Sequence, residues 1–299
     1  MRRTMADALR ALGPDVTLPK VAALYEPLLA AQARDGVSRL LDQRYGGHER
    51  QLLDVYRDPL REGRPMLVWV HGGGFIRGDK AHRANIGYWG AREGFVTILP
   101  NYRLAPLNTW PSGARDIIEV WRWLRQHARS LGGDPQRIVL AGESAGAAHV
   151  AAACLMRRFQ PEDWQIAGAA LLSGPYNAKL EGLARTQLKI ATPDPRNDAY
   201  FGLDQSTWSA ASIVEHVDAQ PFPLWIGFAE QDLLQMHVQA GELFSRLVCH
   251  HGFAPELQLL RDHNHFSSGY SIGTEDSTLS GALAEFIGKH TAPEQPLTT

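Results

Sequence analysis

A succession of short apolar runs, each bounded by turn-forming residues, constrains the fold of this chain more than any other sequence feature. The runs cover residues 66–70, 95–99, 138–141, 167–172, 224–228 and 256–260. Each has the length of a β-strand, and most are continuously apolar rather than alternating with polar residues. Strands of this kind are covered on both faces, which is the usual situation in a parallel sheet.

Amphipathic helices are indicated between these runs. One set of apolar residues follows the i, i+3, i+4, i+7, i+11 spacing of a helix face: Ile117, Val120, Trp121, Leu124 and Ala128. Ser112 is expected to cap the start of this helix, and Gly132 with Gly133 to end it. Further helices are expected near residues 147–156, 243–251 and 277–287. This alternation predicts an α/β fold with a doubly wound, mostly parallel sheet.

Two stretches interrupt the alternation. Residues 1–45 have a helical pattern, and residues 176–220 form a segment rich in Pro, Asp and Trp that is too long for a simple crossover. We expect both to form a small helical cap over the C-terminal edge of the sheet, where ligands bind in open α/β folds. A surface insertion is the alternative. The whole chain, residues 1–299, is interpreted as a single domain.

The composition argues against several classes of function. The formal net charge is only −2, so no basic field would attract nucleic acid or an anionic membrane. No apolar stretch has the length of a membrane-spanning helix, and Asp7 and Arg10 interrupt the region where a signal peptide would be apolar. The two cysteines, Cys154 and Cys249, are too few for a disulfide scaffold and are expected to be reduced and buried. These features predict a cytoplasmic protein without nucleic-acid or membrane partners.

A G-x-S-x-G pattern, Gly142-Glu143-Ser144-Ala145-Gly146, joins one predicted strand to the helix that follows it. Strand, sharp turn and helix are the setting of a nucleophile elbow, in which the serine hydroxyl projects from a strained turn. Small residues at positions 142 and 146 allow neighbouring backbones to approach closely. A glycine-rich structural turn is the alternative, but the flanking elements favour Ser144 as a nucleophile.

A second motif, His71-Gly72-Gly73-Gly74-Phe75, directly follows the strand at 66–70. Backbone amides of residues without side chains can approach a developing oxyanion. We expect the amides of Gly73 and Gly74 to form an oxyanion hole together with the amide of Ala145. A phosphate-binding loop is the alternative, but the P-loop lysine and a G-x-G-x-x-G pattern are both missing.

The HGGGF and GESAG motifs resemble those of hormone-sensitive-lipase-like esterases in the α/β-hydrolase superfamily. Residues 101–106 (NYRLAP) and 133–138 (GDPQRI) are similar to that family's segments between the two motifs. Residues 45–46, 51–56 and 78–80 resemble a neighbouring branch with feruloyl-esterase-like and kynurenine-formamidase-like hydrolases. The resemblance covers about residues 45–290 and implies an α/β-hydrolase fold with serine-hydrolase chemistry. The sequence departs from the family at Ala147, where glycine is usual, and at Leu107-Asn108, where glutamate is common.

The resemblance also implies the other two members of a catalytic triad, which follow the serine as an acid and then a histidine. Asp232 comes just after a predicted strand, where the family has its acid, and Glu230 in the same turn is the alternative. His265 matches the family's His-Phe pair, and His263 is the alternative base.

These residues together predict a serine carboxylesterase that acts through an acyl-enzyme intermediate. Ser144 would be the nucleophile, His265 the general base and Asp232 the residue that orients it. An arylformamidase or amidase with the same triad is the alternative, and a non-catalytic ligand receptor is a minor one. No cofactor is expected, and no metal either, because the histidine pairs lack a third ligand at suitable spacing.

Aromatic residues in loop and cap regions predict a compact pocket for small acyl or aryl esters. The candidates for substrate contact are Phe75, Trp89 and Trp208, and three further aromatic residues lie in the same regions: Tyr88, Trp110 and Phe201. The alternative is that they pack the cap on the sheet. Nothing in the sequence specifies an oligomeric state.

Overall fold

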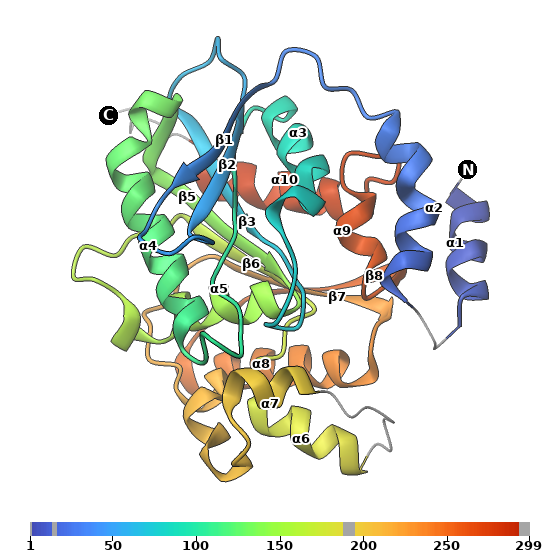
Figure 1. Cartoon of the computed structure of the whole chain (residues 1–299), viewed down its shortest axis with the longest axis vertical. Coiled ribbons are helices and arrows are strands. Elements are labelled where there is room, and N and C mark those ends of the chain that lie inside the picture. Colours follow the sequence, from blue (N-terminus) through green and yellow to red (C-terminus); the bar gives the residue numbers. More distant parts are fainter. Residues whose placement is uncertain (1, 14–16, 188–194, 293–299) are drawn as a thin grey trace, which may run out of the picture.

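The computed structural model describes residues 2–13, 17–187 and 195–292. Its centre is an eight-stranded sheet with the order β1-β2-β4-β3-β5-β6-β7-β8 (Figure 1). The strands are β1 Ser38–Arg44, β2 Leu52–Arg57, β3 Arg64–Val70, β4 Val96–Pro100, β5 Gly133–Glu143, β6 Gly168–Leu172, β7 Leu224–Gln231 and β8 Glu256–Asn264. β2 is antiparallel to both β1 and β4, and all other neighbours are parallel. The predicted, mostly parallel sheet is confirmed.

Helices connect the strands and cover the sheet. The α-helices are α1 Arg2–Ala11, α2 Leu18–Ala30, α3 Ala84–Arg92, α4 Ser112–His127, α5 Ala145–Leu155, α6 Ala178–Gln187, α7 Pro195–Phe201, α8 Leu234–His251, α9 Ser267–Ser271 and α10 Thr278–Thr291. Short 3-10 turns are η1 Lys80–Arg83, η2 Arg129–Leu131, η3 Arg157–Phe159, η4 Gln205–Ala211 and η5 Ile213–Glu215. No helix in the described ranges is both long and apolar enough to cross a membrane.

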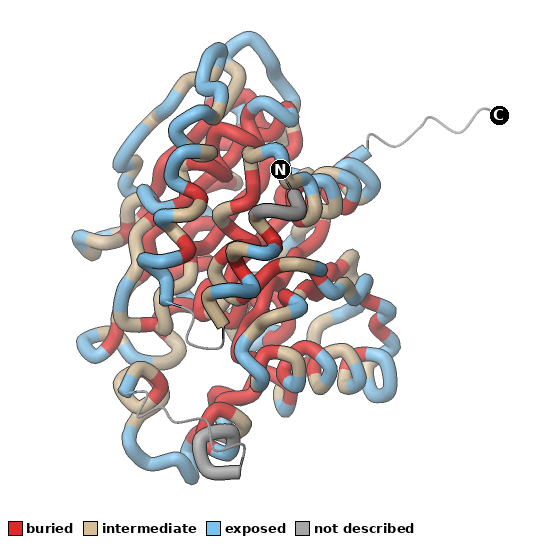
Figure 2. Tube along the Cα trace, turned by 90° about the vertical axis from the view of Figure 1, so that its right-hand side faces the viewer, coloured by how far each residue is buried: buried red, intermediate tan, exposed pale blue. Residues whose placement is uncertain are grey.

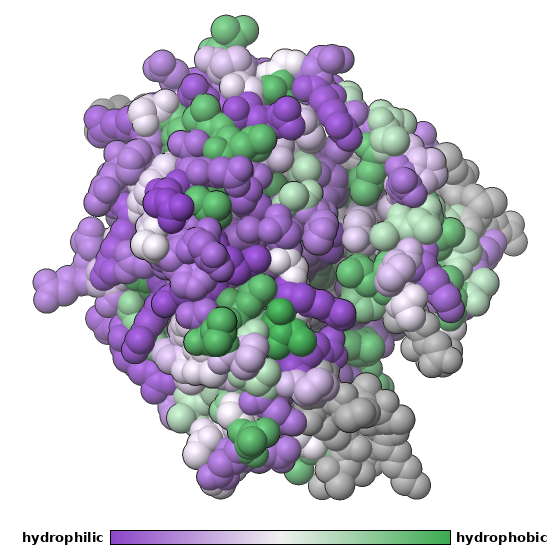
Figure 3. Space-filling view, viewed as in Figure 1, coloured by the Kyte–Doolittle hydropathy of each residue, from purple (hydrophilic) through white to green (hydrophobic). Residues whose placement is uncertain are grey.

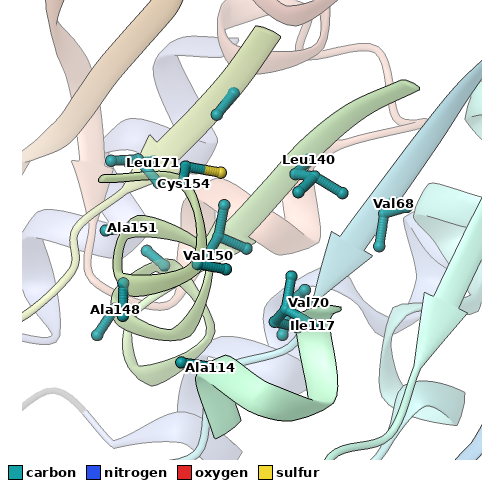
Figure 4. Packing of buried hydrophobic residues seen from close by; sticks show 14 of the residues in the cluster. Val68, Val70, Ala114, Ile117, Leu140, Ala148, Val150, Ala151, Cys154 and Leu171 are labelled. Atoms are coloured by element: carbon teal, nitrogen blue, oxygen red, sulfur yellow. The ribbon is translucent and has the colours of Figure 1, made fainter. Parts of the chain in front are cut away.

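The sheet separates two layers of core, because successive side chains of a strand point to opposite faces. On one face, Val70 and Leu140 pack with Ile117 of α4 and Val150 of α5, as Figure 4 shows. On the other, Trp69 belongs to a separate cluster with residues of α3 and α10. Figure 2 shows the buried trace running through the interior, and on the face seen in Figure 3 apolar side chains form small, separate groups. Both faces of the parallel strands are therefore covered, which explains their continuous apolar runs.

The six predicted strands correspond to β3 through β8, with ends that differ by up to five residues. The prediction that residues 1–45 are helical is wrong for residues 38–44, which form β1, and β2 was not predicted. In β1 the side chains are alternately half-buried and exposed over most of its length, as in an edge strand with one face toward solvent. Its few apolar residues give a weak local signal, and pairing with β2 decides its conformation.

Two local predictions are corrected. Ser112 is the first residue of α4 rather than its cap, and its hydroxyl donates backwards to the Asn108 carbonyl at 3.0 Å. Cys154 is buried in α5, but Cys249 is exposed, because it lies on the outer surface of α8. The helix ends where the sequence predicts: one 3-10 turn follows α4, and Gly132 then adopts φ +75°.

The two segments expected to form a cap lie at the periphery of the fold. α1 and α2 pack beside β8 and α9, and the rings of Tyr25 and Tyr270 stack with centroids 6.1 Å apart. α6 and α7 lie next to each other and beside α8, at the bottom of Figure 1. Residues 1, 14–16 and 188–194 of these segments, like residues 293–299 at the end of the predicted domain, lie outside the described residues.

Candidate active site

Ser144 occupies a sharp turn between β5 and α5. Its backbone has φ +52° and ψ −124°, a conformation that L-residues rarely adopt, and its amide donates to the Leu172 carbonyl at 2.8 Å. The turn brings α5 close against β3, and a Cβ at Gly146 would lie 2.2 Å from the Val70 carbonyl oxygen. Glycine is therefore required at this position, and the strained turn is held by its surroundings.

His265 lies in the short connection between β8 and α9, beside the serine. Its Nε2 is 3.0 Å from Ser144 Oγ, and its Nδ1 is 2.7 Å from Asp232 Oδ1. The imidazole side chain is only 8% exposed. Burial acts to lower the pKa of His265, but the adjacent Asp232 carboxylate outweighs it, so the pKa lies above the ordinary value.

Asp232 follows β7 directly, and its side chain is inaccessible to solvent. Besides His265, its carboxylate accepts hydrogen bonds from the Ser173 hydroxyl, the Ala229 amide and the Leu233 amide. Burial acts to raise the pKa of this carboxyl. The histidine and the hydrogen bonds outweigh burial, so the pKa lies below its usual range. The geometry therefore favours a charged carboxylate facing an imidazole.

The HGGGF loop lies directly against the serine turn. Gly73 has φ +140°, and a Cβ there would lie 1.9 Å from the Arg77 carbonyl oxygen. Within the described part of the chain, the amides of Gly73 and Gly74 donate to no acceptor. Both glycines line the same pocket as Ser144 and Ala145. Donors that are not engaged within the protein remain available to an oxygen of a bound molecule.

Comparison with known proteins assigns the family. Residues 67–265 match the model of a family described as the alpha/beta hydrolase fold. The chain belongs to this family. The superfamily inferred from HGGGF and GESAG is therefore confirmed.

Individual relatives of this α/β-hydrolase chain are distant. It is 25% identical over 275 residues to "Esterase LipQ" of Mycobacterium tuberculosis, an alignment that covers 88% of this chain and 65% of LipQ. The chain thus spans less than two thirds of the length of LipQ, and a smaller share of other curated relatives that it matches.

Solved structures of similar fold include "ESTERASE B" from Lactobacillus rhamnosis, with a TM-score of 0.74, 19% identity and coverage of 97% of this chain and 95% of that one. An esterase described as a member of the bacterial hormone-sensitive lipase family gives a TM-score of 0.72 and 23% identity, with coverage of 97% and 98%.

The alternative triad candidates of this α/β-hydrolase chain lie elsewhere. The Glu230 carboxylate accepts a hydrogen bond from the Asp262 amide rather than from His265. His263 is buried, with Nδ1 3.0 Å from the Ser267 hydroxyl and Nε2 3.3 Å from Asp276. Neither residue lines the pocket beside Ser144, as far as the described residues define it.

The pocket beside Ser144 has a volume of about 820 Å³. Residues of the peripheral segments contribute to its wall: Thr17, Leu18, Pro19, Glu181, Arg196 and Asn197. Many other wall residues are polar or charged, among them His71, Arg77, Asp79, His82, Arg83 and Glu143. Apolar side chains such as Leu233, Met236 and Phe266 also line the pocket, so its wall is mixed rather than mainly aromatic.

Of the three aromatic residues predicted to contact substrate, only Phe75 lines this pocket. Trp89 lies on α3 and packs with Phe95 in the core on the far face of the sheet. Trp208 is fully buried, and its indole N–H donates to the Gly202 carbonyl. The structure thus places these two tryptophans in packing roles, because their rings turn toward apolar neighbours rather than toward the site.

Sequence reasoning missed Ser173 and Arg83. Ser173 follows β6 and donates to Asp232, while Arg83 forms an ion pair with Glu143. The position of Ser173 was a usable signal, since it is a polar residue at the carboxyl end of a buried strand next to β7. Arg83 gave no local signal, because it lies in a 3-10 turn 60 residues from its partner.

Proposed function

We propose that this protein is a serine carboxylesterase that hydrolyses small esters through an acyl-enzyme intermediate. The observation that carries the proposal is the continuous chain from Ser144 Oγ through His265 to Asp232, with distances of 3.0 and 2.7 Å. This arrangement borders a pocket in which two backbone amides have no acceptor among the described residues. The relatives named as esterases support the same reaction class.

In the proposed reaction, neutral His265 accepts the proton of Ser144 as its Oγ forms a bond to the ester carbonyl carbon. The negative charge that develops on the carbonyl oxygen is stabilised by the amides of Gly73, Gly74 and Ala145. The carbon–oxygen bond to the alcohol then breaks, and His265 returns the proton to the leaving alcohol. Water attacks the acyl-enzyme by the same route and releases the acid.

The pocket supports a preference for small substrates. A volume of about 820 Å³ accommodates a short acyl chain and a compact alcohol. A long alkyl chain would also cover charged groups of the wall such as Arg77 and Asp79, which is unfavourable. We propose that helices α2, α6 and α7 act as a cap, because residues from each contribute to this wall. An N-formyl aryl amine could enter the same site, and this remains the alternative substrate class.

The test compares p-nitrophenyl esters from acetate to laurate with an N-formyl aryl amine. Wild type, Ser144→Ala and Ser271→Ala are assayed together; Ser271 is a buried serine whose hydroxyl donates to the Ser268 carbonyl. We expect Ser144→Ala to lower kcat by about 10⁴-fold or more and Ser271→Ala to remain active. Acetate and butyrate should be hydrolysed faster than laurate. Hydrolysis of the formamide alone would replace the ester assignment, and activity retained in Ser144→Ala would overturn the mechanism.

A further inference from the structure

A buried ion pair lies immediately beside the serine turn. Arg83 Nε is 2.5 Å from Glu143 Oε1, and a second guanidinium nitrogen is 3.1 Å from Oε2, so the contact is bidentate. Each side chain is only 8% exposed. Glu143 is the last residue of β5 and directly precedes Ser144 in the chain.

The Glu143 carboxylate also reaches the HGGGF loop. Its Oε1 accepts a hydrogen bond from the Gly72 amide at 3.3 Å, one residue before Gly73. Gly269 of α9 lies against the other oxygen, because a Cβ there would be 2.4 Å from Oε2. The Arg83 guanidinium is in turn stacked 4.5 Å over the ring of Tyr270. One carboxylate thus contacts three elements that surround the candidate site.

Stability alone does not account for this arrangement. A buried ion pair is costly to desolvate, and well-packed apolar residues of similar volume are often as stabilising. The ion pair instead fixes relative positions, because the Glu143 carboxylate holds the Gly72 amide in place relative to the turn that carries Ser144. A bidentate arginine restricts the carboxylate to one orientation.

We propose that Glu143, held by Arg83, is a positioning residue that keeps the HGGGF loop aligned with Ser144. The proposal rests on the esterase mechanism above and extends it to a residue outside the triad and the oxyanion hole. Glu143 does not exchange a proton or bond with the substrate. Its carboxylate acts through the backbone of Gly72 and through its charge.

The charge of Glu143 also acts on His265. Three charged groups influence the imidazole: Asp232 after β7, Glu143 at the end of β5 and Arg196 on α7. The two carboxylates raise the pKa of His265, whereas Arg196 lowers it. Removing the charge of Glu143 therefore lowers this pKa, and the base stays neutral to a lower pH.

The first test compares Glu143→Ala with Glu143→Gln on a short p-nitrophenyl ester. We expect Glu143→Ala to lower kcat about 10- to 100-fold, with KM changed less than about threefold, because transition-state alignment is lost rather than substrate binding. Glu143→Gln should recover part of this loss, since its amide oxygen can still accept from Gly72. Circular dichroism and thermal unfolding establish that each variant is folded. Wild-type kcat in folded Glu143→Ala would overturn the proposal.

The pH profile separates positioning from a general structural effect. In Glu143→Gln the acidic limb of the pH profile of kcat/KM should move to lower pH by about half a unit. Arg83→Lys keeps the positive charge and should leave this limb in place. Asp116→Asn is the matched control, because it removes the charge of another buried carboxylate paired with an arginine, Arg103, and Asp116 does not line the pocket. An unshifted limb in Glu143→Gln, or an equal shift in Asp116→Asn, would contradict the proposal.

A fluorophosphonate probe keeps this test independent of the substrate assignment. The probe reacts with an activated serine and needs no ester pocket. If wild type hydrolyses no ester but is labelled at Ser144, the proposed function fails while the positioning role is still measured. Labelling should then be slower in Glu143→Ala, and equal labelling rates in the two proteins would refute the role of Glu143.

Discussion

Ser173 Oγ lies 2.5 Å from Asp232 Oδ2, the carboxylate oxygen that His265 does not contact. The Ala229 amide donates to the same oxygen, while the Leu233 amide shares Oδ1 with the imidazole. Each carboxylate oxygen therefore has two partners, which fixes the plane of the group. Ser173 itself adopts φ +50° directly after β6. An unusual backbone conformation therefore orients its hydroxyl toward Asp232.

The first prediction concerns this hydroxyl. Ser173→Ala removes one hydrogen bond to a buried carboxylate, so its orientation toward His265 becomes less restricted. We expect kcat for a short ester to fall about three- to tenfold, with little change in KM. Ser271→Ala is the matched control for loss of a buried serine hydroxyl. Equal kcat values in Ser173→Ala and wild type would show that the other three partners suffice.

The second prediction distinguishes the two acidic residues of the turn after β7. Asp232→Asn should lower kcat by about 10³- to 10⁴-fold, because the amide no longer stabilises an imidazolium or selects the required tautomer. Glu230→Gln should leave kcat within about twofold, since Glu230 faces the Asp262 amide instead. Steady-state kinetics on both folded variants is the measurement. A large loss in Glu230→Gln with an active Asp232→Asn would reverse the assignment of the acid.

The third prediction is the pH dependence of wild type. His265 acts as a base only when neutral, and Asp232 raises its pKa above the ordinary value of 6.5. The acidic limb of kcat/KM should therefore lie above pH 6.5, with activity lost as the pH falls through it. The same raised pKa stabilises the folded protein below pH 6.5, and this contribution is lost as the pH rises through the pKa of His265. A limb centred below pH 6.5 would be inconsistent with this environment.

The fourth prediction concerns His149, which is fully buried on α5 among Phe75, Tyr102 and Tyr200. Burial lowers its pKa from 6.5 to about 3. The unfolded chain therefore binds this proton near pH 6.5 and the folded chain does not, so stability falls as the pH decreases. At pH 5 the effect is roughly 2 kcal/mol.

Thermal unfolding between pH 7 and pH 5 tests this linkage. His149→Leu should show a smaller loss of Tm on acidification than wild type. His250→Asn, a change at an exposed histidine, should behave as wild type does. Parallel Tm curves for wild type and His149→Leu would argue against His149 as a source of acid sensitivity.

The fifth prediction follows from the position of Trp208. Because this side chain packs with Ala178 of α6 and Phe201 of α7 and does not line the pocket, Trp208→Phe should lower Tm but leave the acyl-length preference unchanged. Phe75→Leu changes a residue of the pocket wall and should alter KM across the ester series. A changed acyl-length profile in Trp208→Phe would return that residue to the candidates for substrate contact.

The sequence by itself determined the features that depend on neighbouring residues. Strands buried on both faces need continuous apolar side chains, so β3 through β8 were visible as runs. The turn at Ser144 needs small flanking residues and a strand–helix setting, which the local sequence contains. Asp232 and His265 were assigned through family motifs, and the fold brings them within hydrogen-bond distance of each other and of Ser144.

Tertiary structure alone decided which side chains reach the pocket. Trp89, Trp208 and Phe75 are all aromatic, but Trp89 and Trp208 pack in clusters away from the pocket, and the tertiary packing of their elements decides this. β1 exists because β2 supplies its hydrogen bonds, and Arg83 meets Glu143 because η1 packs against the end of β5. These contacts join residues far apart in the chain, so no local pattern in a single sequence encodes them.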